Sequence, residues 1–159
     1  MKKFLPLFLI VISAFCFESC LGIIDDVPKA FVYIGDGSGV SNAVVSNGKN
    51  GSSTLYVTLV TSSSNIQEDI KVYYEAIPGN GLKENVDYKI KEGSPLVFSP
   101  EDATLPLHIS WYANSALDPS KDNTLTIKLV DSNLGNMQFG DPSLPANNNK
   151  STFVFTKKD

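Results

Sequence analysis

The chain has 159 residues, of which 42% are apolar and 19% are charged, and its formal net charge is -4. This length suits one domain with a single core, and the composition is too apolar for a disordered chain and too polar for a multispanning membrane protein. All 13 basic residues are lysines, and the 17 acidic residues outnumber them. This negative net charge argues against a nucleic-acid partner. The chain has a single histidine, His108, and two cysteines, both of which lie in the first twenty residues, so it has no set of ligands for a Cys/His zinc site. We expect no cofactor.

The first twenty residues are typical of an export signal. Lys2 and Lys3 precede an apolar run that extends from Phe4 to Phe17. This run is shorter than the roughly 20 residues that a membrane-spanning helix needs, and its length suits the apolar region of a signal peptide. Small Ser19 directly before Cys20 resembles the bacterial lipobox, in which the cysteine is acylated and becomes the mature N-terminus. An ordinary secretory signal and a buried N-terminal helix are the alternatives.

The cysteine content supports acylation of Cys20. No cysteine follows it, so a disulfide partner is absent after maturation and acylation accounts for the odd thiol. We therefore expect a lipoprotein signal peptide at 1–19, a lipidated tether at 20–29 and one domain at 30–159. Without residues 1–19 the chain keeps 16 acidic residues and 11 lysines, so the lipid alone must hold it to the membrane.

The remainder of the chain alternates apolar and polar residues with period two, which predicts strands with one buried face. Turn-forming clusters such as Asn47-Gly48 and Gly79-Asn80-Gly81 separate the alternating segments. Pro106 cannot donate to a ladder, so its strand is expected at an edge or at a bulge. The predicted strands are Ala30–Gly35, Thr54–Thr61, Asp69–Ile77, Val86–Lys91, Leu96–Ser99, Thr104–Tyr112, Asn123–Val130 and Ser151–Thr156.

These segments predict an all-β domain, an antiparallel two-sheet sandwich of about seven or eight strands. Trp111 shares a face with Leu105, Leu107 and Ile109 and is expected in the core. Gly35-Asp36-Gly37-Ser38-Gly39 follows a strand, as a phosphate loop does, but the next residues favour turn or strand over the helix that such a loop requires. We expect a flexible hairpin loop there.

The order of elements between Asp69 and Val130 resembles a Calx-beta domain. An alternating strand is followed by Asn85-Val86-Asp87-Tyr88, by Leu96-Val97-Phe98-Ser99-Pro100-Glu101, by Leu105-Pro106-Leu107-His108-Ile109 and by Leu125-Thr126-Ile127-Lys128-Leu129. The whole is also similar to uncharacterised single-domain lipoproteins of Bacteroidetes, which have Gly-Asp-Pro and an Asn-rich stretch before a last strand, here Gly140-Asp141-Pro142 and Asn147-Asn148-Asn149-Lys150. The resemblance implies an immunoglobulin-like or Calx-beta-like fold in the cell envelope.

Some Calx-beta domains bind calcium through clustered loop carboxylates. Calcium needs six to eight oxygen ligands, and several of them are usually carboxylates. The candidates here are scattered, so we predict solvated loop acids and no metal site; they are Glu101, Asp102, Asp118, Asp122, Asp131 and Asp141.

Exposed aromatic residues are the candidate binding groups. Alternation places Tyr73, His108 and Tyr112 on outward faces, where they would form one patch if their strands were neighbours. Aromatic rings with polar neighbours suit the stacking of a sugar. His108 has no nucleophile and acid arranged as in a catalytic triad, so we predict no catalysis.

The sequence predicts a lipid-anchored, non-catalytic protein of a bacterial outer membrane, on the cell surface or facing the periplasm. Its expected role is a binding or scaffolding module, with polysaccharide or other envelope proteins as partners besides the membrane lipid. The alternative is a structural adhesion or assembly subunit that pairs through an exposed strand edge.

Overall fold

The computed structural model describes residues 30–61 and 68–159. The predicted signal peptide at 1–19 and the predicted tether at 20–29, which begins with Cys20, fall outside these residues. No helix in the two described ranges is long and apolar enough to cross a membrane. The strands are β1 (Ala30–Gly35), β2 (Asn42–Ser46), β3 (Gly51–Thr61), β4 (Ile70–Pro78), β5 (Tyr88–Ile90), β6 (Leu96–Phe98), β7 (Thr104–Trp111), β8 (Thr124–Ser132), β9 (Met137–Phe139) and β10 (Thr152–Lys158), with a 3-10 turn η1 (Ala146–Asn148) before the last.

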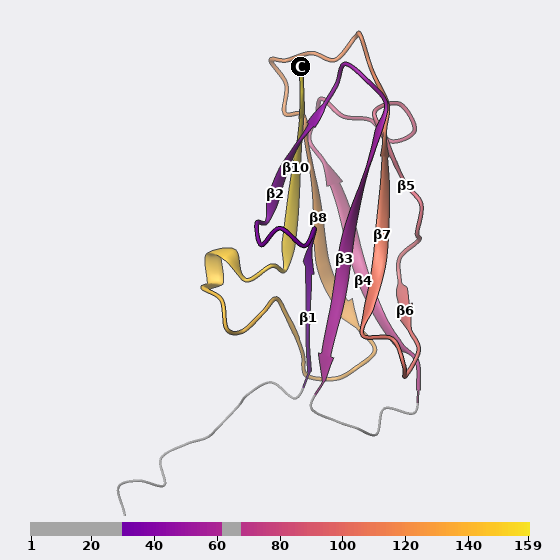
Figure 1. The fold of residues 1–159 in the computed structure, drawn as a ribbon, viewed down its shortest axis with the longest axis vertical. Coiled ribbons are helices and arrows are strands. Elements are labelled where there is room, and N and C mark those ends of the chain that lie inside the picture. Colours follow the sequence, from indigo (N-terminus) through magenta and orange to yellow (C-terminus); the bar gives the residue numbers. More distant parts are fainter. Residues whose placement is uncertain (1–29, 62–67) are drawn as a thin grey trace, which may run out of the picture.

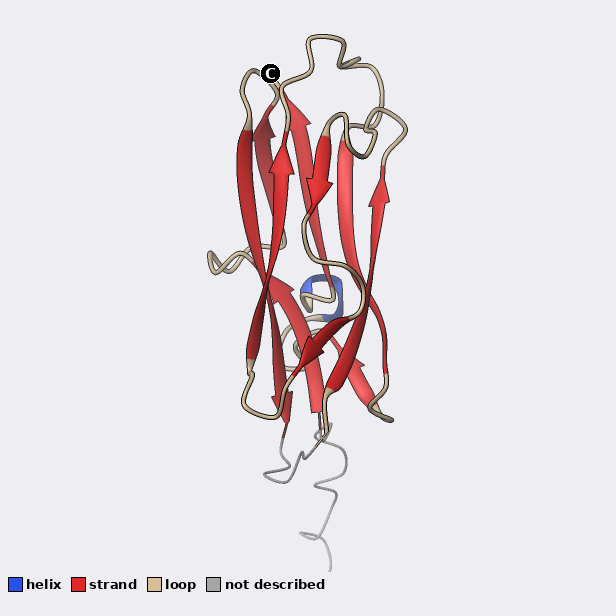
Figure 2. Ribbon diagram, turned by 90° about the vertical axis from the view of Figure 1, so that its right-hand side faces the viewer, coloured by secondary structure: helices blue, strands red, loops and turns tan. Residues whose placement is uncertain are grey.

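The strands form two five-stranded sheets packed face to face, which confirms the predicted sandwich (Figures 1 and 2). Sheet A has the order β5-β7-β3-β1-β9, and sheet B has the order β2-β10-β8-β4-β6. The strands run along the long axis of the molecule, with the start of β1 at one end and the C-terminus at the other (Figure 1).

The sheets are mixed rather than purely antiparallel, which departs from the prediction. Edge strand β9 pairs with β1 in parallel, and edge strand β2 pairs with β10 in parallel. These two are also the strands that the sequence did not predict. β9 has three residues, and no residue of β2 is fully buried, so neither produces a clear alternating pattern.

The glycine segment after β1 is not a hairpin loop, which corrects the prediction. β1 lies in sheet A and β2 in sheet B, so residues 36–41 carry the chain from one sheet to the other. Gly37 and Gly39 have φ of 85° and 88°, a left-handed conformation that glycine adopts without strain.

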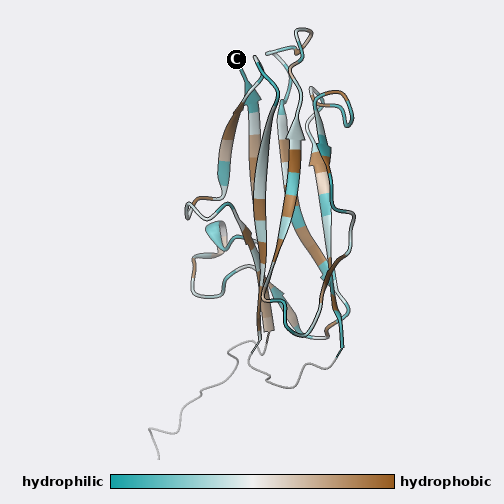
Figure 3. Ribbon diagram, turned by 45° about the vertical axis from the view of Figure 1, so that its right-hand side comes forward, coloured by the Kyte–Doolittle hydropathy of each residue, from teal (hydrophilic) through white to brown (hydrophobic). Residues whose placement is uncertain are grey.

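Buried and more exposed residues alternate along the longer strands, and Figure 3 shows apolar and polar residues alternating along several of them. Trp111 is 2% exposed, as predicted, and its Nε1 donates to Ser53 Oγ at 3.0 Å. The buried cluster between the sheets consists of Val32, Ile34, Leu55, Val57, Leu59, Ile70, Val72, Leu82, Tyr88, Leu96, Phe98, Leu107, Ile109, Trp111, Leu125, Ile127, Leu129, Phe153 and Phe155.

The position of Pro106 follows from the shortness of β5. β5 pairs with β7 only from Ile109 to Trp111. The backbone N–H and C=O of His108 point toward the side of β7 on which β5 lies, because the carbonyl accepts from Lys91 N and the amide donates to Glu92. Pro106, two residues earlier, points its nitrogen the same way, beyond the end of β5. β7 itself lies between β5 and β3, so the prediction of an edge strand is wrong for β7 as a whole, and Pro106 is accommodated because β5 does not extend along β7 as far as this residue.

Candidate functional site

The three aromatic residues predicted to share a patch do not lie together. Tyr73 points outward from β4, which belongs to sheet B, whereas His108 points outward from β7, which belongs to sheet A. Consecutive strands cross between the sheets, so β4 pairs with β8 and β6, and β7 pairs with β3 and β5. The two side chains therefore face opposite sides of the sandwich.

His108 is engaged by an acid rather than by a neighbouring tyrosine. Its amide donates to Glu92 Oε2 and its Nδ1 lies 2.6 Å from Glu92 Oε1. Burial disfavours the ionised form of Glu92, but the hydrogen bonds from His108 outweigh it and lower the pKa of the carboxyl. Glu92 thus satisfies a backbone group of β7 at the point where β5 leaves the sheet, which is a structural role.

Tyr112 directly follows β7, and its backbone forms hydrogen bonds with the loop before β5 and with β10. Its amide donates to Asp87 O at 3.0 Å and its carbonyl accepts from Lys157 Nζ at 2.7 Å. Its backbone is thereby fixed at the C-terminal end of the molecule, four residues along the chain from His108.

A different group of side chains meets on the outer face of sheet A. Buried Val32 and Ile34 turn Tyr33 outward on β1, and buried Leu55 and Val57 turn Tyr56 outward on β3. The register places Tyr33 opposite Thr58 and Gly35 opposite Tyr56, so the two tyrosines are diagonal neighbours on adjacent strands. This pair could not be deduced from sequence, because β1 skips β2 to pair with β3.

The two tyrosines line an open hollow of about 410 Å³ on the outer face of sheet A. We call it the tyrosine hollow; its lining residues are Tyr33, Gly35, Gly37, Gly39, Tyr56, Thr58, Thr104 and Lys150. Tyr56 is 46% exposed. Gly35 is the cross-strand partner of Tyr56 and has no side chain, which leaves open space beside the Tyr56 ring. A Cβ at Gly35 would meet no atom within 4 Å.

Polar groups border the rings on two sides. Thr58 and Thr104, partners across β3 and β7, place their hydroxyl oxygens 3.1 Å apart. Lys150 comes from the segment after η1, beside β1 in Figure 1, and its Nζ lies 5.8 Å from the centre of the Tyr33 ring. Phe31 extends the aromatic surface along β1, with its ring centre 6.2 Å from that of Tyr33. Rings, hydroxyls and one ammonium group are therefore open to solvent on one face.

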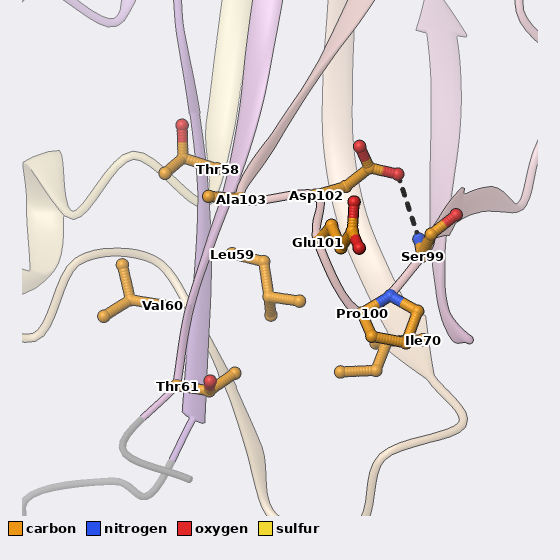
Figure 4. Close-up of a pocket in the computed structure, with 10 residues that line it drawn as sticks. All are labelled: Thr58, Leu59, Val60, Thr61, Ile70, Ser99, Pro100, Glu101, Asp102 and Ala103. Atoms are coloured by element: carbon orange, nitrogen blue, oxygen red, sulfur yellow. Dashed lines mark hydrogen bonds between the residues drawn. The ribbon is translucent and has the colours of Figure 1, made fainter. Parts of the chain in front are cut away.

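A second hollow lies at the end of the sandwich where β1 begins. Figure 4 shows its lining side chains from the end of β3 and from the loop between β6 and β7, and its volume is about 380 Å³. The carboxylate of Asp102 is used within the loop, where it accepts from Ser99 N at 3.1 Å. Thr61 at its rim directly precedes residues 62–67, which lie outside the described residues, so we assign no site there.

The loop carboxylates do not gather into a metal site in the described ranges, where no three acidic, histidine or cysteine side chains come together. Instead, Asp118 and Asp141 each accept a hydroxyl hydrogen bond from the serine two residues later, at 2.6 Å. These hydrogen bonds lower the pKa of both carboxyls.

Comparisons with known proteins inform the fold alone. No protein-family model matches the chain, and no curated protein matches it. The chain is similar to the crystal structure of Bacteroides thetaiotamicron EndoBT-3987 with Man5GlcNAc product, with a TM-score of 0.54 and 12% sequence identity. The similarity covers 80% of this chain but 31% of that one, so this chain corresponds to under a third of that protein's length.

Proposed function

We propose that this chain is a non-catalytic, lipid-anchored module of a bacterial cell envelope, and that it binds a glycan in the tyrosine hollow. The observation that carries the proposal is the diagonal placement of Tyr33 and Tyr56 on adjacent strands, beside the open space at Gly35. A pyranose ring has an apolar C–H face that stacks on an aromatic ring, and hydroxyls at its edge that need polar partners.

The groups around the rings suit this ligand. Thr58 and Thr104 supply hydroxyls that both donate and accept, and Lys150 supplies an ammonium donor. Because the hollow is open on one side, it would accept part of a longer chain. A bound glycan would therefore stack on the tyrosine rings and form hydrogen bonds with the threonine and lysine side chains that line the hollow.

The composition of the hollow supports binding over cleavage. Glycosidases commonly use two carboxyl groups on either side of the scissile bond. The described side chains that line the hollow are tyrosine, threonine and lysine, and none of them is a carboxyl group. The similarity to a protein solved with a Man5GlcNAc product is compatible with a glycan-related role.

The test is a binding assay on three variants and one matched control. Tyr56→Ala and Tyr33→Ala remove a stacking surface, whereas Gly35→Val fills the hollow with a residue that strands favour. We expect each to weaken polysaccharide binding by about tenfold or more in affinity electrophoresis. Tyr73→Ala removes an outward tyrosine of sheet B and should leave binding unchanged. Equal effects of Tyr73→Ala and Tyr56→Ala would refute the proposal.

The edge strand β2 favours a second candidate, an assembly subunit. Among the described residues β2 pairs with β10 alone, and Val44 of β2 is 61% exposed. A free edge with an apolar side chain is a surface for pairing with another strand. If this is the role, sedimentation should detect concentration-dependent oligomers that Val44→Lys abolishes. A monomer at all concentrations would contradict it.

A further inference from the structure

We infer that Lys157, Asp87 and Asn114 form a self-reacting group, in which the lysine amine displaces ammonia from the asparagine side chain and joins β10 to the loop after β7 through an amide bond. The inference goes beyond the proposed function and is independent of it. It follows from the position of one buried nucleophile, from the acid that this nucleophile shares with an amide, and from the hydrogen bonds around that amide.

Lys157 is a nitrogen nucleophile held inside the sandwich. Its side chain is 0% exposed and continues the inward series of Phe153 and Phe155 on β10. Its Nζ donates to Asp87 Oδ1 at 2.9 Å and to Tyr112 O at 2.7 Å. Burial removes the water that stabilises an ammonium charge, and proteins use this effect to turn a lysine into a nucleophilic amine.

Asp87 connects this lysine to an amide. Its Oδ1 accepts from Lys157 Nζ at 2.9 Å and also from Asn114 Nδ2 at 2.8 Å, so the nucleophile and the amide meet at one oxygen. The Asp87 side chain is 3% exposed. Burial disfavours both charges of the pair, and moving one proton along their hydrogen bond neutralises both at once. Asp87 is therefore placed to take a proton from the lysine and to give one to the amide nitrogen.

The side-chain carbonyl of Asn114 is polarised for attack. Its Oδ1 accepts from Ala116 N at 3.0 Å, and this N–H would stabilise the negative charge that develops on the oxygen. The backbone of Asn114 is held by Asn47, whose Nδ2 donates to Asn114 O at 3.0 Å and whose Oδ1 accepts from Asn114 N at 3.1 Å. The amide is thus fixed in place, with a donor on its oxygen and an acid on its nitrogen.

The reaction needs only these three side chains, and its protons pass through Asp87. Asp87 first takes a proton from the Lys157 ammonium, which leaves a neutral amine and a neutral acid. The amine lone pair forms a bond to Cγ of Asn114, and the π electrons of the carbonyl move to Oδ1. Asp87 gives its proton to Nδ2 and takes one from Nζ. The C=O bond then re-forms while the bond from Cγ to Nδ2 breaks, so the products are a secondary amide, ammonia and a protonated Asp87.

The ion pair is the resting form of the group, so the amide forms slowly. Hydrogen bonds from Asn114 and Lys157 outweigh burial and lower the pKa of Asp87, which keeps the neutral acid and amine a minor form. A freshly folded chain therefore contains the ion pair, and the cross-link accumulates as the folded chain ages.

The amide would serve this chain as a covalent brace in place of a disulfide. No cysteine follows Cys20 in the sequence. A bond between positions 114 and 157 would close β8, β9 and β10 into one covalent ring, and such a ring reduces the entropy of the unfolded chain. The last strand would then stay attached to the domain even in a denaturant that contains a reductant.

Peptide mapping of the full chain after prolonged incubation at neutral pH tests the inference. The chain is denatured and digested with trypsin, which does not cleave after an acylated lysine. We expect a joined species of residues 92–121 and 151–158, with the summed mass of the two peptides less one ammonia. A succinimide at an Asn-Gly pair also loses ammonia but joins no two peptides, so the joined species is the readout.

Two results of the mapping would overturn the inference. In the first, the aged chain gives only separate peptides, with cleavage after Lys157. In the second, Lys157 is joined to Asp87 with the loss of one water, which would show that the carboxyl group and not the Asn114 amide is the group attacked.

Three variants test the roles of the side chains, with circular dichroism as the check that each one folds. Asn114→Ala keeps the ion pair and removes the amide, so it should give no joined species. Asp87→Asn cannot carry the protons, so the joined species should form about a hundredfold more slowly or not at all. Lys158→Met changes the exposed neighbour on β10 and should react as the wild type does. A joined species at Lys157 in Asn114→Ala, or a wild-type rate in Asp87→Asn, would contradict the assigned roles.

Discussion

Lys157 and Asp87 form an ion pair inside the sandwich, close to the C-terminal end. Nζ and Oδ1 lie 2.9 Å apart, and the two side chains are 0% and 3% exposed. Asp87 also accepts from Asn114 Nδ2 at 2.8 Å and from Lys83 N at 2.9 Å. With the hydrogen bond from Lys157 to Tyr112 O, this pair links β10 to the loops that precede β5 and follow β7.

The first prediction concerns this pair. Lys157→Met should lower the free energy of unfolding by about 3–5 kcal/mol, because it leaves the buried Asp87 carboxylate without its counter-charge. Urea unfolding followed by Trp111 fluorescence measures the loss.

Lys158→Met is the matched control, since the next residue along β10 is exposed. It should change stability by less than about 0.5 kcal/mol. Equal losses in the two variants would contradict a specific role for the buried pair.

A second prediction is that stability falls in acid. Burial alone would raise the pKa of Asp87, but hydrogen bonds from Asn114 and Lys157 outweigh burial and lower it. Burial would likewise raise the pKa of Glu92, and hydrogen bonds from His108 outweigh it and lower that pKa. A carboxyl whose pKa is lower in the folded state contributes stability that is present above its unfolded pKa, about 4, and that is lost as pH falls through the folded value. Urea unfolding between neutral pH and pH about 3 should show this decline.

Glu92→Gln isolates one contributor to the acid effect. It removes the titrating group, so the decline below pH about 4 should be shallower than in the wild type. Glu101→Gln, which removes an exposed carboxyl in the loop before β7, should leave the slope as it is. A slope unaffected by Glu92→Gln would contradict the assignment.

Two glycines should respond differently to alanine. A Cβ at Gly81 would lie 1.9 Å from Asn123 Oδ1, an atom buried in the loop region, whereas a Cβ at Gly35 meets nothing within 4 Å. Gly81→Ala should therefore destabilise the fold by about 1–3 kcal/mol. Gly35→Ala should be neutral or stabilising. Thermal unfolding of both variants checks this, and a reversed order would contradict the packing described at these positions.

The proposed anchor predicts the fate of Cys20. When the full chain is expressed in a Gram-negative host, it should incorporate labelled palmitate and partition into detergent, and Cys20→Ser should lose both properties. Cys16→Ser should retain them. Labelling that depends on Cys16, or an unlabelled wild type, would contradict lipidation at Cys20.

Alternation along the chain was sufficient to predict the eight longer or more regular strands and their inward faces. Lys157 continues the inward series of Phe153 and Phe155, so the same alternation extends to the buried lysine. β2 and β9 are short edge strands whose formation depends on β10 and β1, so their own residues carry little pattern.

The site was harder to predict than the fold, because it depends on strand order. Outward positions for Tyr33 and Tyr56 follow from alternation, but their adjacency requires β1 to pair with β3. Lys150 reaches the same place through a loop fixed by Gly140 and Asn149, which no local pattern encodes. The three aromatic residues chosen from sequence lie apart for the same reason, since the crossing of strands between sheets separates Tyr73 from His108.

Chemical-shift mapping of backbone amides during titration with a soluble oligosaccharide tests the central claim most directly. The account predicts that the largest perturbations fall on Tyr33, Gly35–Gly39, Tyr56–Thr58, Thr104 and Lys150, with no change around Tyr73 on the opposite sheet. Perturbations centred on sheet B, or none at saturating oligosaccharide for a chain that binds the parent polysaccharide, would contradict it.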